Sequence, residues 1–196
     1  MTSRKGQARR AQVVDIALHR FAAHGYRGVS LATIAQEAGI SEAGLIHHYP
    51  TKPALLLAVL DHYEAGSIEL MKAARETSDG SFTGAWLALA ASHEADPTYI
   101  RLFTVLAAES VAPEHPAHVW FVERYERVRG RITEAFAADQ AAGRIRPELS
   151  PELCARQLVA MFDGIQLQYL LAGGALDLVT PLRELLDSFT DSSSRA

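Results

Sequence analysis

The sequence contains only one cysteine, Cys154, among its 196 residues. A single thiol cannot form an intramolecular disulfide, which fits a reducing cytoplasm. The chain also lacks an uninterrupted apolar stretch of about 18 residues, which a membrane-spanning helix requires. Its basic beginning, MTSRKGQARR, is followed by an amphipathic segment and not by the apolar core of a signal peptide. We therefore expect a cytoplasmic globular protein with no membrane segment.

The short motifs of common enzymes are missing as well. The sequence has no G-x-S-x-G, no glycine-rich phosphate loop and no H-E-x-x-H. Its carboxylates Glu109, Glu123, Glu126 and Asp163 are scattered over helical segments, where solvation or helix capping explains them better than acid–base chemistry. We expect neither enzyme activity nor a cofactor.

The eight histidines raise the hypothesis of a metal site. His47 and His48 are adjacent, His115 and His118 are close in sequence, and His93 stands apart. A metal site needs several convergent ligands at suitable spacing, and one cysteine without a dense cluster of His, Asp and Glu gives little support. Hydrogen bonding in a loop and at a helix start explains the second pair better, so we expect no metal.

Apolar residues recur at helical spacing along the chain, without strand-like alternation or an internal repeat. This pattern predicts an all-α fold of about nine helices. They are expected at about residues 9–24, 31–38, 42–48, 52–77, 82–95, 98–111, 118–142, 151–172 and 178–189. Residues 1–8 are expected to form a flexible basic arm, which either reaches phosphates and a minor groove or is merely solvated. Asp79-Gly80 is expected to end a helix, and residues 190–196 to be disordered.

Residues 30–52 contain two short helical segments around a tight turn. Ser30 is suited to cap the first segment, and apolar residues at i, i+3, i+4 and i+7 give it one buried face. Gly39 follows where a left-handed residue ends a helix, and Ser41 is suited to cap the second segment. Little more than Leu45 is placed for burial in that second segment, so its other side chains point outward. These features predict a helix-turn-helix.

The next helix is expected to start with Lys52, capped by Thr51. The positive end of a helix dipole favours a lysine there only if an anion, such as a phosphate, sits at the same place. Residues 1–52 carry seven Lys/Arg and three Asp/Glu, a net charge of +4, whereas the remainder carries −8. A basic head on an acidic body is typical of a DNA-binding module joined to a separate regulatory domain.

Together with the preceding FAAHGYRGVS, the run SLATIAQEAGISEAGLIHHYPTK resembles the N-terminal domain of the TetR (tetracycline-repressor) family, over about residues 11–60. The pieces RLFTVLAAES, HPAHVWFVERY and DGIQLQYLL are similar to the C-terminal domain of the branch that includes choline-responsive repressors. The resemblance implies a three-helix DNA-binding domain at residues 1–52 and a helical ligand-binding and dimerisation domain at residues 53–196.

The resemblance also implies roles for single residues of the head. Phosphate contacts are expected from Ser30, Ser41 and Lys52, major-groove contacts from Glu42, Ala43, Gly44 and His47, and a marginal position for His48. The sequence departs from the family at Ile46, where tyrosine is usual, and at Gly44, where threonine or serine is common. Glu42 either accepts from a cytosine amine or only complements the helix dipole. Tyr49 is expected to pack in the core of the head.

For the body, the resemblance implies a pocket for a small-molecule effector. The aromatic, methionine and amide residues expected near it are Trp86, Phe103, Phe121, Tyr125, Met161 and Gln166. An ordinary helix-bundle core explains most of these residues equally well.

The helix expected at residues 151–172 is apolar on nearly all faces. Between residues 155 and 176 only Arg156 and Asp163 are charged. One domain covers only part of such a helix, so we expect a homodimer through the last two helices. Our leading hypothesis is a homodimeric repressor that binds a palindromic double-stranded DNA operator and is released by the effector. The alternative is a helical protein-interaction module that does not bind specific DNA, and salt dependence distinguishes the two.

Overall fold

The structure is a computed structural model that describes residues 4–77 and 82–190. Within these residues it contains nine helices and one isolated bridge between Ile145 and Thr190. The helices are α1 (Arg4–His24), α2 (Leu31–Glu37), α3 (Glu42–His48), α4 (Lys52–Thr77), α5 (Phe82–Ala95), α6 (Thr98–Glu109), α7 (His118–Ala141), α8 (Pro151–Leu171) and α9 (Val179–Phe189). The all-α class is confirmed. No helix in the described part of the chain is long and apolar enough to cross a membrane.

Helix boundaries follow the sequence prediction except at the N-terminus. The prediction of a flexible arm was wrong for residues 4–8, which form the first turns of α1. Arginine, lysine, glutamine and alanine are good helix formers, and the single Gly6 among them weakens the helix by only about 1 kcal/mol relative to alanine. Three predicted features lie outside the described residues: the start of the arm at residues 1–3, the helix break at Asp79-Gly80 and the tail at residues 191–196. Thr190, expected in the disordered tail, is paired with Ile145.

The chain forms two compact units. The first contains α1, α2, α3, the beginning of α4, α6 and the residues that follow it as far as Phe121. The second contains the end of α4, α5, the rest of α7, α8 and α9. The domain boundary between residues 52 and 53 stays a prediction, since it follows from the resemblance and not from this grouping.

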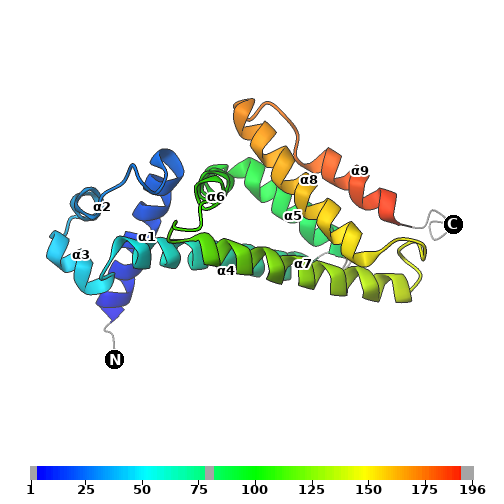
Figure 1. The fold of residues 1–196 in the computed structure, drawn as a ribbon, viewed down its shortest axis with the longest axis horizontal. Coiled ribbons are helices and arrows are strands. Elements are labelled where there is room, and N and C mark those ends of the chain that lie inside the picture. Colours follow the sequence, from blue (N-terminus) through cyan, green and yellow to red (C-terminus); the bar gives the residue numbers. More distant parts are fainter. Residues whose placement is uncertain (1–3, 78–81, 191–196) are drawn as a thin grey trace. The chain divides into compact units, whose positions relative to one another are not determined.

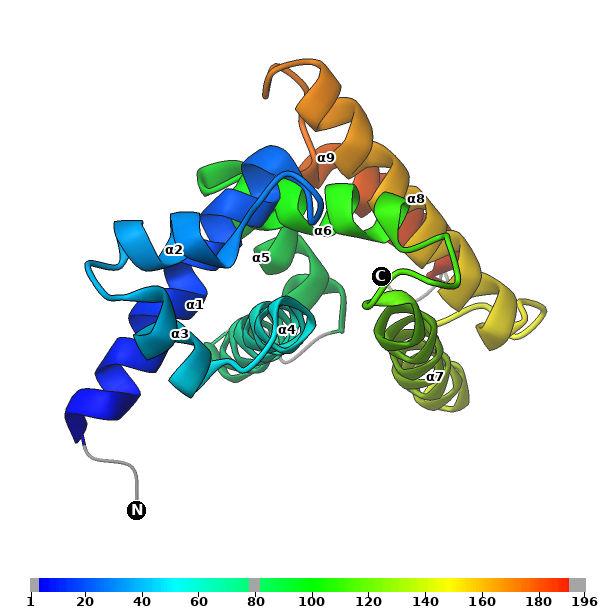
Figure 2. The same cartoon turned by 60° about the vertical axis from the view of Figure 1, so that its left-hand side comes forward.

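In the first unit, α2 and α3 lie beside α1 (Figure 1). Figure 2 shows α6 packed along α1, close to the end of that helix. Phe21 of α1, Ile34 of α2 and Leu45 of α3 are each fully buried, and Leu56 brings the start of α4 into the same core. These contacts fix the small helices of the head on one side of α1.

A turn stabilised by a distant carboxylate follows α1. Gly25 has a φ of +68°, which favours glycine, and a side chain there would collide with the carboxylate of Glu109. The N–H of Tyr26 donates to Oε2 of Glu109 at 2.7 Å. The end of α6 therefore fixes the turn that leads from α1 to α2.

In the second unit, α9 packs against α5 and α8. Phe136 of α7 makes edge contacts with Phe82 of α5 and Phe189 of α9, with ring centroids 5.2 and 5.4 Å apart. Ser150 caps α8 by accepting from the N–H of Leu153, as the sequence predicted. Aromatic rings from α5, α7 and α9 thus meet in the core of this unit.

This core also contains a buried polar pair. Nε2 of Gln166 on α8 donates to Nδ1 of His93 on α5 at 3.1 Å, which places the ring proton of His93 on Nε2. The imidazole stacks on Phe162. Burial lowers the pKa of His93 to about 4; Arg124 acts in the same direction and Asp96 against it. His93 is therefore neutral at pH 7.

We expect this histidine to make the protein less stable in mild acid. The unfolded imidazole takes up a proton near pH 6.5 and the folded one only near pH 4, so the unfolded state binds more protons in this window. His93 by itself should lower the free energy of unfolding by about 3 kcal/mol as the pH drops through the window. In urea unfolding between pH 7 and pH 4.5, His93→Gln should lose this dependence.

Asp163, whose pKa burial raises, acts in the opposite direction in both proteins. The difference between wild type and variant therefore isolates His93. An equal loss of stability in His93→Gln would show that other groups cause the acid sensitivity.

Candidate nucleic-acid interface

The two-turn helix α3 exposes most of its surface. Leu45 is its one buried residue, with no exposed area. Glu42, Ala43 and His47 are exposed, and Gly44, beside them, is partly exposed. A helix attached by a single buried side chain leaves the rest of its surface to another molecule.

The helices α2, α3 and α4 each begin with an N-terminal cap. Ser30 accepts from the N–H of Thr33 at the start of α2, and Ser41 accepts from that of Gly44 at the start of α3, both at 3.1 Å. Thr51 accepts from the N–H of Ala54 at the start of α4. All three caps were predicted from the sequence. Each leaves further backbone N–H groups at the positive end of its helix, where a phosphate oxygen can bind.

Gly44 is constrained by one of these caps. A Cβ at this position would lie 3.3 Å from the hydroxyl of Ser41. The serine or threonine that is common here in the family would press against the cap. With glycine at this position, α3 exposes its backbone where a serine or threonine would expose a hydroxyl group.

Lys52 lies against an aromatic ring. Its ammonium is 4.3 Å from the ring centroid of Tyr26, in the turn that Glu109 fixes. Burial lowers the pKa of Lys52, and Glu109 acts against this shift. The cation is thus positioned at the first residue of α4. Tyr26 and Glu109 were not predicted, because neither lies in the helix-turn-helix pattern.

The start of α1 supplies two further contacts that the sequence did not reveal. Arg9 donates to the carbonyl of Ala38, and Arg10 donates to the carbonyl of His48. From the sequence alone, both arginines were included only in the net charge of the head. Tyr49 is 5% exposed and donates to the carbonyl of Arg10, so the prediction that it packs in the head is confirmed.

Comparison with known proteins identifies the family. Residues 13–59 match the bacterial regulatory proteins of the tetR family, and residues 86–193 match the C-terminal domain of BetI-type transcriptional repressors. The chain belongs to the TetR family. It is a DNA-binding transcriptional repressor with a BetI-type body, and not an enzyme.

Individual relatives agree with this assignment. The transcriptional regulatory protein RaaS of Mycobacterium tuberculosis is 31% identical over 160 residues, which are 82% of this chain and 70% of RaaS. The regulator BetI of Burkholderia thailandensis is 28% identical over 180 residues, 90% of this chain and 89% of BetI. The crystal structure of a TetR regulator from Chloroflexus aurantiacus superposes with a TM-score of 0.81 at 22% identity, covering 96% of this chain and 98% of that one. This last likeness shows the fold alone.

The six residues expected around an effector are divided between the two units. Phe103 and Phe121, with ring centroids 5.2 Å apart, belong to the first unit. Trp86 packs edge-on against Phe162, which also stacks on the histidine that Gln166 binds.

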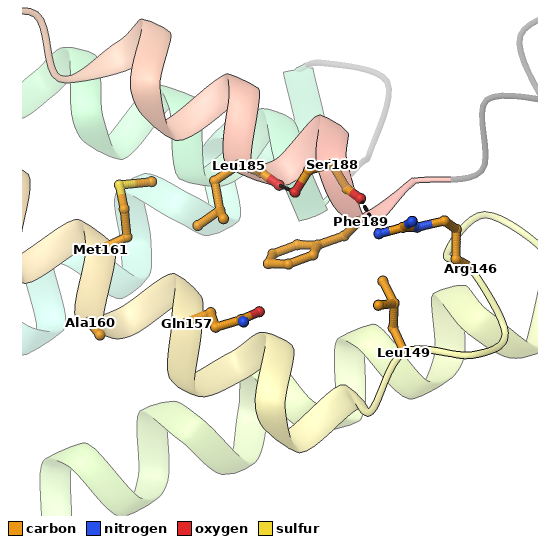
Figure 3. A pocket seen from close by; sticks show the side chains of 8 residues that line it. All are labelled: Arg146, Leu149, Gln157, Ala160, Met161, Leu185, Ser188 and Phe189. Carbon is orange, nitrogen blue, oxygen red and sulfur yellow. Dashed lines mark hydrogen bonds between the residues drawn. The ribbon is translucent and has the colours of Figure 1, made fainter.

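The two remaining residues lie elsewhere in the second unit. Tyr125 donates to Oδ2 of Asp163 at 2.8 Å. Met161 lines a surface groove of about 620 Å³ between α8 and α9 (Figure 3). The groove is lined by Arg146, Leu149, Gln157, Ala160, Met161, Leu185, Ser188 and Phe189. Whether any of the six residues binds an effector stays a prediction.

The histidines of the loop between α6 and α7 make internal hydrogen bonds. Nδ1 of His115 lies 2.8 Å from Oγ of Ser110 and accepts from the N–H of Ala117. Nδ1 of His118 lies 2.9 Å from the carbonyl oxygen of Ser110. Across residues 4–77 and 82–190, no three His, Cys, Asp or Glu side chains form a group that could hold a metal ion.

Proposed function

We propose that this repressor acts in the cytoplasm as a homodimer whose two α3 helices enter successive major grooves of a palindromic operator. The observation that carries this proposal is the exposure of α3, which is anchored by Leu45 alone and lies among three capped helix N-termini. Binding of a small-molecule effector in the body then releases the DNA. The helix α4 is continuous from Lys52 to Thr77, so it joins the head to the body. Through this helix, effector binding in the body changes the population of distances between the two heads of the dimer.

The proposed contacts divide into two classes. Ser30, Ser41 and Lys52 contact phosphates, which fixes the head on the duplex without reading its sequence. The exposed side of α3 meets base edges in the major groove. The base-contacting residues are Glu42, Ala43, Gly44 and His47, with His48 at the margin of the groove.

Selection of bound sequences from a random pool of duplexes tests this proposal. The wild-type protein should enrich a palindrome with half-sites about one helical turn apart. Lys52→Ala should weaken binding to this operator and to an unrelated duplex by a similar factor. It should also reduce the slope of log affinity against log salt by about one, because one phosphate contact is lost.

Lys72→Ala is the matched control, since Lys72 is an exposed lysine of the same helix, in the second unit. It should bind both duplexes as the wild type does. If no duplex were enriched, and binding to DNA were absent even at low salt, the alternative of a protein-interaction module would be supported instead.

The dimer is proposed from the outward face of α8. Leu153, Leu167 and Leu171 are 55, 46 and 79% exposed, and Leu176, just beyond the helix, is 47% exposed. These exposed leucines belong to α8 and the residues just beyond it, and the groove shown in Figure 3 adds Met161, Leu185 and Phe189 between α8 and α9. A second copy of the chain is the occupant we propose, since an isologous interface buries the same surface on both protomers.

We expect Leu167→Glu combined with Leu171→Glu to weaken the dimer. Both charges occur twice in a symmetric interface, so the dissociation constant of the dimer should rise at least about 100-fold. Sedimentation or light scattering at micromolar protein would measure it, and operator affinity should fall in parallel. Val111→Glu is the control, because Val111 is 76% exposed in the first unit. A double variant that remains dimeric would exclude this interface.

The effector is proposed to interact with the α5 and α8 side chains around Trp86. The indole Nε1 of Trp86 is buried and meets no acceptor among the described residues, which costs about 1–3 kcal/mol. An effector that offers an acceptor atom recovers this free energy. His93 beside it is neutral, which favours an uncharged partner.

We therefore expect uncharged compounds with a carbonyl acceptor, such as ketones, esters and tertiary amides, to raise the melting temperature of the wild type in a thermal-shift screen. Trp86→Phe keeps the ring and removes the N–H, so it should lose at least half of each shift. Hits should also release the selected operator from the wild type. A compound that releases the operator equally well from Trp86→Phe would contradict the role of this N–H.

A further inference from the structure

Two consecutive arginines near the start of α1 bind the ends of two other helices. Nη1 of Arg9 donates to the carbonyl of Ala38 at 3.0 Å, and Nη1 of Arg10 donates to that of His48 at 3.2 Å. Ala38 is the C-cap of α2, and His48 is the last residue of α3. The last carbonyls of a helix lack intrahelical partners and carry partial negative charge. Each guanidinium therefore binds where a helix most favours a cation.

The contact of Arg10 is reinforced by Tyr49, the residue after α3. The guanidinium carbon of Arg10 lies 4.8 Å from the ring centroid of Tyr49. In return, the phenol of Tyr49 donates to the backbone carbonyl of Arg10 at 3.3 Å. Since Tyr49 is 5% exposed, its ring is a fixed support. Arg10 thus connects α1 to the end of α3 through its side chain and its backbone.

Such a connection matters because α3 has little else to hold it against α1. Leu45 is its only buried side chain, and one anchor does not stop a helix from rolling about its axis. The hydroxyl of Ser41 accepts from an N–H of α3 itself, so this cap does not orient the helix relative to α1. The contacts at the C-terminal end supply that second fixed point.

We propose that Arg9 and Arg10 are positioning residues for operator recognition. Arg10 sets the orientation of α3 in the major groove, and Arg9 fixes the end of α2 before the turn. They thereby determine how well the protein discriminates between DNA sequences, although neither reads a base. This inference rests on the proposed reading of the operator by α3.

A simple phosphate contact is the competing role for an exposed arginine in a basic head. The two roles differ in what they change. A phosphate contact strengthens binding to every duplex equally and adds to the salt dependence. A positioning residue changes the ratio between the affinities for the operator and for an unrelated duplex.

The experiment measures this ratio over a salt series, with the operator that the wild type selects and a shuffled duplex of the same length. Arg10→Lys keeps the charge but lacks the planar fork that binds a carbonyl while lying on a ring. We expect it to lower the ratio about tenfold with an unchanged salt slope. Arg10→Met should lower the ratio as much, and Arg9→Lys should lower it in the same direction. Arg27→Met, which removes a charge from an exposed arginine beyond α1, should leave the ratio unchanged.

Two results would overturn the proposal. One is an Arg10→Lys protein with the ratio of the wild type. The other is an Arg10→Met protein that binds both duplexes more weakly by the same factor, with a salt slope lower by about one. Thermal unfolding shows whether a variant has a damaged head. If Arg10→Met is damaged, the affinity ratio of Arg10→Lys decides between the two roles. If the wild type enriched no duplex, the proposed function would fail together with this inference, whereas unaltered ratios in the variants would refute the inference alone.

Discussion

The helix α3, which we propose reads the operator, must remain exposed for that role, and this requirement limits how it can be held. A typical surface helix is oriented by a wide apolar stripe, but α3 has Leu45 alone. Any further buried side chain would be withdrawn from the surface that we propose meets DNA. Contacts at the end of the helix therefore have to help orient it. After the last turn of α3, Arg10 and Tyr49 supply a hydrogen bond, a ring contact and a buried side chain.

The same arrangement continues into α4 and α6. Lys52, the first residue of α4, lies over the ring of Tyr26, and the N–H of Tyr26 is bound by the carboxylate of Glu109 at the end of α6. Gly25 is favoured there because its backbone is left-handed, and a side chain at this position would displace the carboxylate that binds Tyr26. A displacement of α6 thus acts directly on the turn that supports a proposed phosphate-binding cation. This connection gives α6 a physical means of influencing the head.

The sequence predicted the parts of the head that depend on local chemistry. The hydroxyl of Ser41 and the N–H that it accepts from are three residues apart, so the cap is visible as a short pattern. The arm was mispredicted over residues 4–8, because helix-forming residues were interpreted through their charge alone. Arg9, Arg10 and Glu109 could not have been assigned, since their partners lie 29, 38 and 83 residues away. Nothing in one sequence identifies such pairs.

In the body, α8 departs from the usual distribution of polarity at a few positions. Its inward face holds the Gln166 amide bonded to His93, and its outward face exposes Leu167 and Leu171. The periodicity of the sequence detects only that the helix is apolar all round, which conceals this difference. An apolar outer face favours association with a second copy, whereas buried polar groups restrict the core to the packing that satisfies them. The buried N–H of Trp86 has no hydrogen-bond partner among the described residues. On the proposed function, an effector supplies the missing acceptor. Pairing of that N–H would add to the affinity of the effector, and it would favour one conformation only as far as the other conformation does not offer the same hydrogen bond.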